Sequence, residues 1–82
     1  MYFVYILRSK KDDSFYTGVT ENLKTRLHEH NRGGAEYSSS KTPFMIVWFC
    51  AFPVKGIAYE FEEYLKSHSG IAFRNKRLVR LN

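Results

Sequence analysis

Two apolar runs separated by a polar turn open the chain. Residues 2–7 and 15–20 are rich in aromatic and β-branched side chains, whereas residues 9–14 are Ser, Lys and Asp. Runs of this kind joined by turn-forming residues predict a β-hairpin. The first run is apolar on both of its faces, which is typical of a strand that is covered on each side. We therefore expect the first strand to be central in its sheet.

The middle of the chain predicts a helix, a loop and a third strand. Asn22 is a favourable N-cap residue, and helical periodicity continues from it to about His30, where two glycines soon follow. Residues 33–43 contain Gly, Ser, Lys and Pro with few apolar side chains, which indicates a loop. Residues 44–52 are rich in aromatic and β-branched side chains and have a proline at each end. We expect a strand there.

The C-terminal part of the chain predicts two more helices. Residues 57–67 have helical periodicity, Ser69 and Gly70 interrupt it, and residues 71–81 have a basic amphipathic pattern. The predicted order is ββαβαα, and 82 residues supply one hydrophobic core. We expect a single α+β domain, residues 1–82, with a three-stranded antiparallel sheet flanked by helices.

Composition narrows the class of protein. Hydrophobic residues make up 44% of the chain and aromatic residues 17%, which argues against an intrinsically disordered chain. No apolar run reaches the roughly 20 residues that span a bilayer, and residues 1–7 lack the basic start and the cleavage site of a signal peptide. The single cysteine, Cys50, cannot form an internal disulfide. We expect a cytoplasmic protein that contacts no membrane.

The charge of the chain points to a polyanionic partner. Thirteen Lys and Arg against eight Asp and Glu give a net charge of +5, which favours nucleic acid but also suits a merely solvated surface. No acidic residue follows Glu63, so the basic residues of this end are candidate phosphate contacts: Lys66, Arg74, Lys76, Arg77 and Arg80. In or beside the loop, Arg32, Tyr37 and Lys41 either contact a substrate or are simply solvated.

Three ionisable side chains fall on the apolar faces of the predicted helices. At about 100° per residue, Arg26 and His30 lie with Leu23 and Leu27 on one face of the first helix, and Glu62 borders the apolar stripe of the second. Burying a charge without a partner is costly, so these groups must be paired or used. Arg26 and Glu62 either form a structural ion pair or belong to a site.

Two tyrosines and a glycine lie in the predicted hairpin. Tyr5 is in the middle of the first strand and Tyr16 is near the start of the second, so strand pairing can bring them together. Each is also explained as a core aromatic residue with a hydrogen-bonded hydroxyl. Gly18 faces the same side as Tyr16 and leaves room for the backbone of a ligand to approach.

These residues in this order resemble the GIY-YIG nuclease superfamily. That superfamily includes the catalytic domain of the bacterial excision-repair incision subunit, certain homing endonucleases and many small stand-alone bacterial proteins. The first family motif corresponds to Phe3-Val4-Tyr5 and the second to Tyr16-Thr17-Gly18. The family's helix arginine falls on Arg26, with His30 one turn later, and its metal-binding glutamate falls on Glu62. The replaced motif positions, Phe3, Val4 and Thr17, concern packing rather than chemistry.

The resemblance implies a metal-dependent endonuclease that hydrolyses phosphodiester bonds in DNA, in repair or recombination. Glu62 would hold one Mg²⁺ or Mn²⁺, and Arg26 would clamp the scissile phosphate. Tyr5 would activate the attacking water, with its pKa lowered by Arg26, the metal ion and a hydrogen bond from Tyr16 or His30. His30 is the alternative base, because its reference pKa of about 6.5 suits the task.

Two other functions stay open. The fold can serve as a non-catalytic nucleic-acid-binding or adaptor domain, or as a plain structural module in which Arg26 and Glu62 form an ion pair. Many family members carry a separate DNA-recognition domain, for which 82 residues leave no room, so we expect a partner protein to supply specificity. A catalytic site requires that the two tyrosines, Arg26, His30 and Glu62 converge in one cleft. Glu62 on the far side of the sheet from Arg26 would contradict it.

Overall fold

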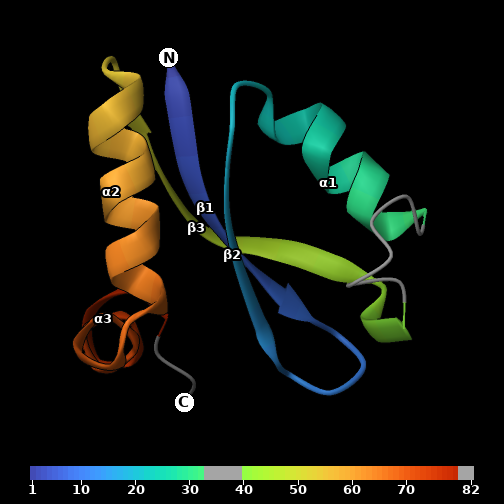
Figure 1. Cartoon of the computed structure of the whole chain (residues 1–82). Coiled ribbons are helices and arrows are strands. Elements are labelled where there is room, and N and C mark those ends of the chain that lie inside the picture. The colour runs from blue at the N-terminus through green and yellow to red at the C-terminus, as the bar shows by residue number, and fades with distance from the viewer. Residues whose placement is uncertain (33–39, 80–82) are drawn as a thin grey trace.

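The strands and helices follow one another in the predicted order. The computed structural model describes residues 1–32 and 40–79. Its elements are β1 (Tyr2–Ser9), β2 (Phe15–Thr20), α1 (Leu23–Asn31), β3 (Phe44–Phe52), α2 (Lys55–Lys66), α3 (His68–Phe73) and the π-helical segment η2 (Arg74–Leu78). The expected α+β fold with the order ββαβαα is confirmed, since η2 continues the last helix (Figure 1).

The three strands form one antiparallel sheet in the order β2-β1-β3. The central position of β1 is therefore confirmed. β1 extends two residues beyond the predicted end because Arg8 and Ser9 pair with Met45 and Phe44 of β3. In the register with β2, Tyr5 lies opposite Gly18.

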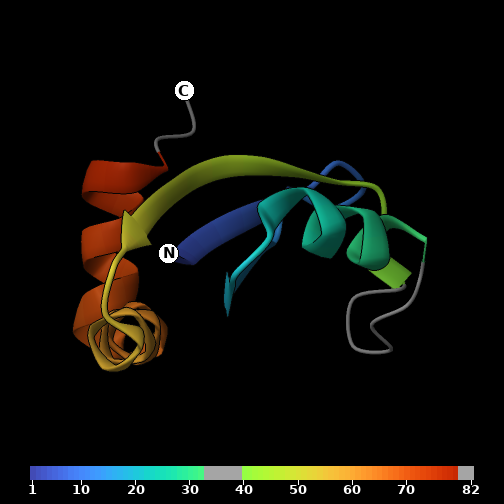
Figure 2. The ribbon, with the colours of Figure 1, turned by 90° about the horizontal axis from the view of Figure 1, so that it is seen from above.

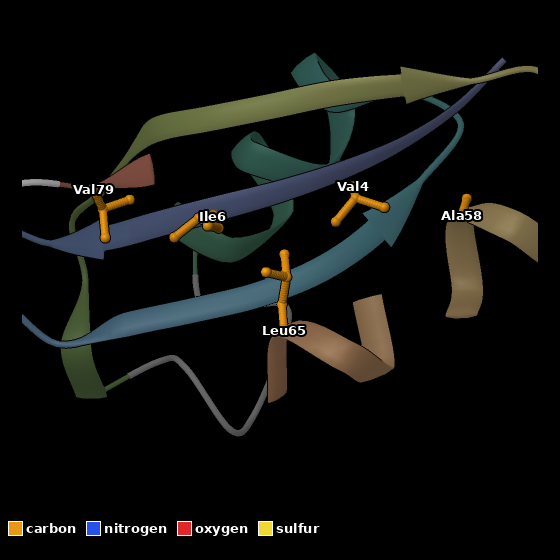
Figure 3. Packing of buried hydrophobic residues seen from close by; sticks show 5 residues of the cluster. All are labelled: Val4, Ile6, Ala58, Leu65 and Val79. Atoms are coloured by element: carbon orange, nitrogen blue, oxygen red, sulfur yellow. The ribbon is translucent and has the colours of Figure 1, made fainter. Parts of the chain in front are cut away.

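Both faces of the sheet are covered, as expected. Successive side chains of a strand point to opposite faces, and on one face Val4 and Ile6 pack with Ala58 and Leu65 of α2 (Figure 3). Val79, after η2, joins the same cluster. In Figures 1 and 2 the pair formed by α2 and α3 and the helix α1 lie on opposite sides of β2.

The other face of the sheet carries α1. Tyr5 and Leu7 of β1 form a second cluster with Phe44, against which Leu23 and Leu27 of α1 pack. The predicted N-cap is confirmed, because the side chain of Asn22 accepts a hydrogen bond from the backbone N–H of the third helical residue at 3.0 Å. Both ends of α1 are therefore fixed by asparagines, since Asn31 at its C-terminal end also bonds to the first residue of β3.

The last two helices differ from the sequence prediction. α2 begins at Lys55, two residues early, and α3 begins at His68 rather than at residue 71. The prediction that Ser69 and Gly70 interrupt the helix is wrong, because Gly70 lies inside α3. The backbone N–H of Gly70 donates a hydrogen bond to the Ser67 hydroxyl at 3.1 Å. A Cβ at Gly70 would collide with the backbone carbonyl of Tyr64, so glycine is required by close packing on α2.

The last helical segment ends at Leu78, so the prediction that the helix continues to residue 81 is wrong. Arg80 lies outside the described residues. Within residues 1–32 and 40–79, no helix is long and apolar enough to cross a bilayer.

Candidate active site

The hydroxyl of Tyr5 is the centre of a buried polar cluster on the α1 face of the sheet. Tyr5 is only 2% exposed, and its oxygen lies 3.4 Å from Arg26 Nε, which donates to it, and 3.3 Å from His30 Nε2. Arg26 and His30 are four residues apart on α1, so both side chains point the same way. The prediction that they face the sheet with the leucines is confirmed, because His30 is fully buried.

Tyr16 completes this cluster from the edge strand β2. Its ring centre lies 4.6 Å from the imidazole of His30 and 6.4 Å from the ring of Tyr5. Phe44 covers the imidazole from β3, with 5.9 Å between ring centres. The structure thus brings together four of the predicted site residues: Tyr5, Tyr16, Arg26 and His30. We call these four the Tyr5 cluster.

Gly18 gives the Tyr5 ring its place. A Cβ at Gly18 would lie 2.6 Å from Cζ of Tyr5 and closer still to the hydroxyl oxygen. The space that we expected to admit the backbone of a ligand is therefore filled by the phenol itself. Glycine at this position supports the site by letting Tyr5 reach α1.

Burial sets the protonation of the cluster. The pKa of Tyr5 is raised, first by burial and then by the charges of Tyr16 and Glu62, although the hydrogen bond from Arg26 opposes the shift. The pKa of His30 is lowered by burial and by the positive charge of Arg26. A protonated phenol therefore faces a neutral imidazole at neutral pH. The protein groups alone raise the pKa of Tyr5, contrary to the lowering that was expected with a metal ion bound, because desolvation outweighs the hydrogen bond from Arg26.

Arg26 connects the buried cluster to the surface. Its side chain is 38% exposed, and its Nη1 forms an ion pair with Glu29 Oε1 at 3.1 Å. The hydrogen bond to Tyr5 raises the pKa of the guanidinium, which stays charged. Among the described residues Arg26 pairs with Glu29, and Glu62 pairs with Lys66, so the alternative of an Arg26–Glu62 ion pair is wrong.

Glu62 is buried but stands apart from these four residues, so the expected convergence of all five side chains in one cleft is not confirmed. It belongs to α2, which packs on the other face of the sheet, and its carboxylate is 12% exposed and 2.6 Å from Nζ of Lys66. Lys66 and Tyr16 line the same hollow beside β2, and the charge of Glu62 reaches Tyr5 and raises its pKa. Figure 1 shows β2 between α1 and α2, with the two helices on opposite sides of it.

Among the described residues, a metal ion near the Tyr5 cluster would have Glu62 as its protein ligand. The described residues contain no group of three or more His, Cys, Asp or Glu side chains that could hold an ion by themselves. Mg²⁺ commonly keeps several waters and binds through one or two carboxylates plus substrate phosphate oxygens. Glu62 supplies one such carboxylate, already balanced by the positive charge of Lys66. An ion held here needs oxygen ligands from water and substrate.

The remaining basic candidates lie at two ends of the molecule. Arg74 lines the hollow beside β2, whereas Lys76 and Arg77 are exposed on η2. Arg32 is exposed at the end of α1, and Lys41 forms an ion pair with Asp12 at 2.7 Å. Tyr37 lies outside the described residues.

Two supporting residues were not predicted from the sequence. Glu29 holds Arg26 from the i+3 position, a spacing that was visible in the sequence. The side-chain amide of Asn31 accepts a hydrogen bond from the backbone N–H of Phe44 at 2.6 Å and donates one to its carbonyl at 3.1 Å. These two bonds fix β3 beside His30. The sequence showed Asn31 only as part of a helix stop.

Comparisons with known proteins agree with this architecture. The GIY-YIG catalytic domain matches residues 1–76. A UPF0213 protein of Clostridium perfringens is 42% identical over 79 residues, which are 95% of this chain and 80% of the relative. A UPF0213 protein of Nitratidesulfovibrio vulgaris is 40% identical over 67 residues, which are 80% of this chain but only 60% of the relative.

A solved structure has the same fold. The solution NMR structure of a UPF0213 protein from Bacillus halodurans is 35% identical, with a TM-score of 0.57, and the match covers 95% of this chain and 87% of that one. The name UPF0213 states no activity, so these relatives show a shared family without indicating a reaction. The chain belongs to the family of GIY-YIG catalytic domains, which is a family of nucleases.

Proposed function

We propose that this protein is an endonuclease that hydrolyses phosphodiester bonds in DNA with the help of one divalent metal ion. The observation that carries the proposal is the hydroxyl of Tyr5, which is hydrogen-bonded to a charged Arg26 and a neutral His30 inside a buried cluster. Hydrolysis of a phosphodiester needs an activated water, compensation of charge on the phosphoryl oxygens and help for the leaving oxygen.

Arg26 is suited to bind the scissile phosphate. Its Nε is held by Tyr5 and its Nη1 by Glu29, and the side chain, which is 38% exposed, also interacts with Tyr16. A planar guanidinium binds two non-bridging oxygens at once, which a lysine does not. A phosphate competes with Glu29 for this group and brings the phosphorus atom next to the Tyr5 hydroxyl.

Tyr5 and His30 are suited to remove the proton of the attacking water together. His30 is fully buried, so the proton reaches it through Tyr5. The water gives its proton to the Tyr5 oxygen, and Tyr5 passes its own proton to Nε2 of His30, which becomes an imidazolium. No phenolate needs to exist beforehand, which agrees with the raised pKa of Tyr5. Tyr16 keeps the imidazole in place through its ring contact.

Glu62 is the proposed ligand of the metal ion, Mg²⁺ or Mn²⁺. Bound there, the ion would supply positive charge for the phosphoryl and leaving oxygens. Lys66 has to release a carboxylate oxygen for this, and its half-exposed side chain is free to swing toward solvent. The net charge of +5 supports a polyanionic substrate. A role in DNA repair or recombination in the cytoplasm, with a partner protein that supplies specificity, is part of the proposal.

One assay distinguishes the proposed endonuclease from the alternative, a non-catalytic nucleic-acid-binding domain. The protein is incubated with nicked, branched and single-stranded DNA in Mg²⁺ or Mn²⁺, alongside Glu62→Ala and the matched control Glu63→Ala. Glu63 is the exposed neighbour of Glu62 and loses the same charge. We expect cleavage by the parent and by the control, and none by Glu62→Ala or with EDTA. Equal cleavage by the parent and Glu62→Ala would reveal a contaminant, and binding without cleavage in every metal would favour the alternative.

A further inference from the structure

A hollow of about 470 Å³ lies beside the Tyr5 cluster, between β2 and the helices α2 and α3. Its lining includes Phe15, Tyr16, Leu65, Lys66, Ile71 and Arg74. It borders the candidate active site on two sides, because Tyr16 also contacts His30 and Lys66 also pairs with Glu62. Its volume falls in the roughly 300–1,000 Å³ range of small-molecule pockets.

The lining combines apolar walls with positive charge. Phe15, Leu65 and Ile71 are apolar, two cations face the hollow, and none of its lining residues is acidic. An apolar wall beside cations is suited to a ligand that has a flat, weakly polar part and an anionic part, as a nucleotide has.

Arg74 is the cation best placed to hold a phosphate. Its guanidinium carbon lies 4.6 Å from the centre of the Phe15 ring, and its Nε donates to the Asn75 side chain at 3.0 Å. No carboxylate in residues 1–32 and 40–79 forms an ion pair with it, and burial lowers its pKa. A partly desolvated cation of this kind is stabilised by an anion.

We propose that this hollow binds one unpaired nucleotide adjacent to the scissile phosphate, with its phosphate on Arg74 and its base against Ile71. The position next to the scissile phosphate rests on the proposed function, whereas the binding of a nucleotide does not. A base has to leave its stack and its pairing to enter a side-chain pocket, which costs least in single strands and at branch points. The preferred substrate is therefore DNA with unpaired nucleotides at the cleavage site.

Binding of a mononucleotide tests the hollow without any cleavage. Thymidine 5′-monophosphate is titrated into the protein in EDTA while the NMR signals of two methyl-bearing residues that line the hollow, Thr17 and Ile71, are followed. We expect both signals to shift and Arg74→Met to weaken binding by about tenfold, the effect of losing one charge-assisted hydrogen bond. The matched control Arg8→Met removes the same charge, but Arg8 pairs with Asp13 and does not line the hollow. Equal weakening by both variants, or shifts confined to other residues, would overturn the proposal.

A second variant tests selectivity for unpaired DNA. Ile71 is 39% exposed, so Ile71→Trp fills the hollow without disturbing the core. Measured by fluorescence anisotropy in EDTA, this variant should bind a single-stranded oligonucleotide about tenfold more weakly and duplex DNA as before. The same loss on both DNAs would contradict the proposal. A protein that binds the mononucleotide in the hollow but cleaves nothing would overturn the proposed function alone.

Discussion

The two faces of β1 pack against different kinds of side chain. Val4 and Ile6 point to α2 and lie in a wholly apolar cluster, whereas Tyr5 and Leu7 point to α1, where a phenol, an imidazole and a guanidinium share the interior. The apolar face gains its stability from burial alone. The polar face has to satisfy each buried group with a specific partner.

In this small fold, the buried groups that hydrogen-bond to one another lie on the α1 face of the sheet. On the α1 face, burial raises the pKa of Tyr5 and lowers that of His30, so desolvation holds both groups neutral within hydrogen-bonding distance. The α2 face carries its one buried carboxylate, Glu62, at the edge of the apolar cluster next to β2. We therefore expect substitutions in the apolar cluster of the α2 face to change stability, and substitutions in the Tyr5 cluster to change activity.

The sharpest separation is expected for Arg26→Met. Its side chain is partly exposed, so the free energy of unfolding should change by no more than about 1 kcal/mol. The single-turnover cleavage rate should fall by about 10³-fold, the usual effect of removing a group that stabilises transition-state charge. Arg8→Met is the control, because Arg8 pairs with Asp13 at the hairpin turn. Similar cleavage rates for Arg26→Met and Arg8→Met would contradict the assignment of Arg26 to the active site.

The opposite result is expected for Ile6→Ala. Ile6 is fully buried on the α2 face, so the free energy of unfolding should fall by about 2–5 kcal/mol in a urea titration. The cleavage rate per folded molecule should stay close to that of the parent, because no group of the Tyr5 cluster is changed. A selective loss of activity with little loss of stability would contradict the assignment of this face.

A glycine on the α1 face links packing to activity. In Gly18→Ala the new methyl group must displace the Tyr5 phenol, which should cost about 1–3 kcal/mol and also slow cleavage. Gly56→Ala is the matched control, since a Cβ there meets nothing within 4 Å and the residue lies in α2. It should stabilise the protein by roughly 0.5–1 kcal/mol. Urea titration and cleavage assays on both variants measure the difference.

The smallest expected effect is the dependence of stability on pH. The pKa of His30 is lowered from 6.5 in the folded protein, so below pH 6.5 the unfolded chain binds a proton that the folded chain does not. Stability from this residue is complete above pH 6.5 and is lost as the pH falls toward the lower folded pKa. Denaturation at pH 7 and pH 5 should therefore show a larger loss for the parent and for the exposed control His28→Gln than for His30→Gln.

Much of the fold and part of the site followed from local pattern. The strands, the cap at Asn22 and the faces of Arg26 and His30 depend on spacing within one element, and these predictions are confirmed. The place of Gly70 depends on a contact between two helices, which no spacing reveals, and that prediction was wrong.

Electrostatic properties of the site were beyond the sequence. The sign of the Tyr5 pKa shift follows from the balance of burial against one hydrogen bond, which requires coordinates. The partners of Arg26 and Glu62 are neighbours on their own helices, at i+3 and i+4, whereas an ion pair between the two was one of the alternatives open from the sequence. The stacking of Arg74 on Phe15 joins residues 59 positions apart, as only the folded chain shows.

The cleavage rate of Tyr5→Phe tests most directly whether the Tyr5 hydroxyl takes part in the reaction. This substitution keeps the ring against Gly18 and Tyr16 and removes only the hydroxyl that contacts both Arg26 and His30. With the fold verified by NMR and saturating Mn²⁺, we expect the single-turnover rate on branched DNA to fall by at least about 10²-fold. Cleavage by Tyr5→Phe at the rate of the parent would contradict the account.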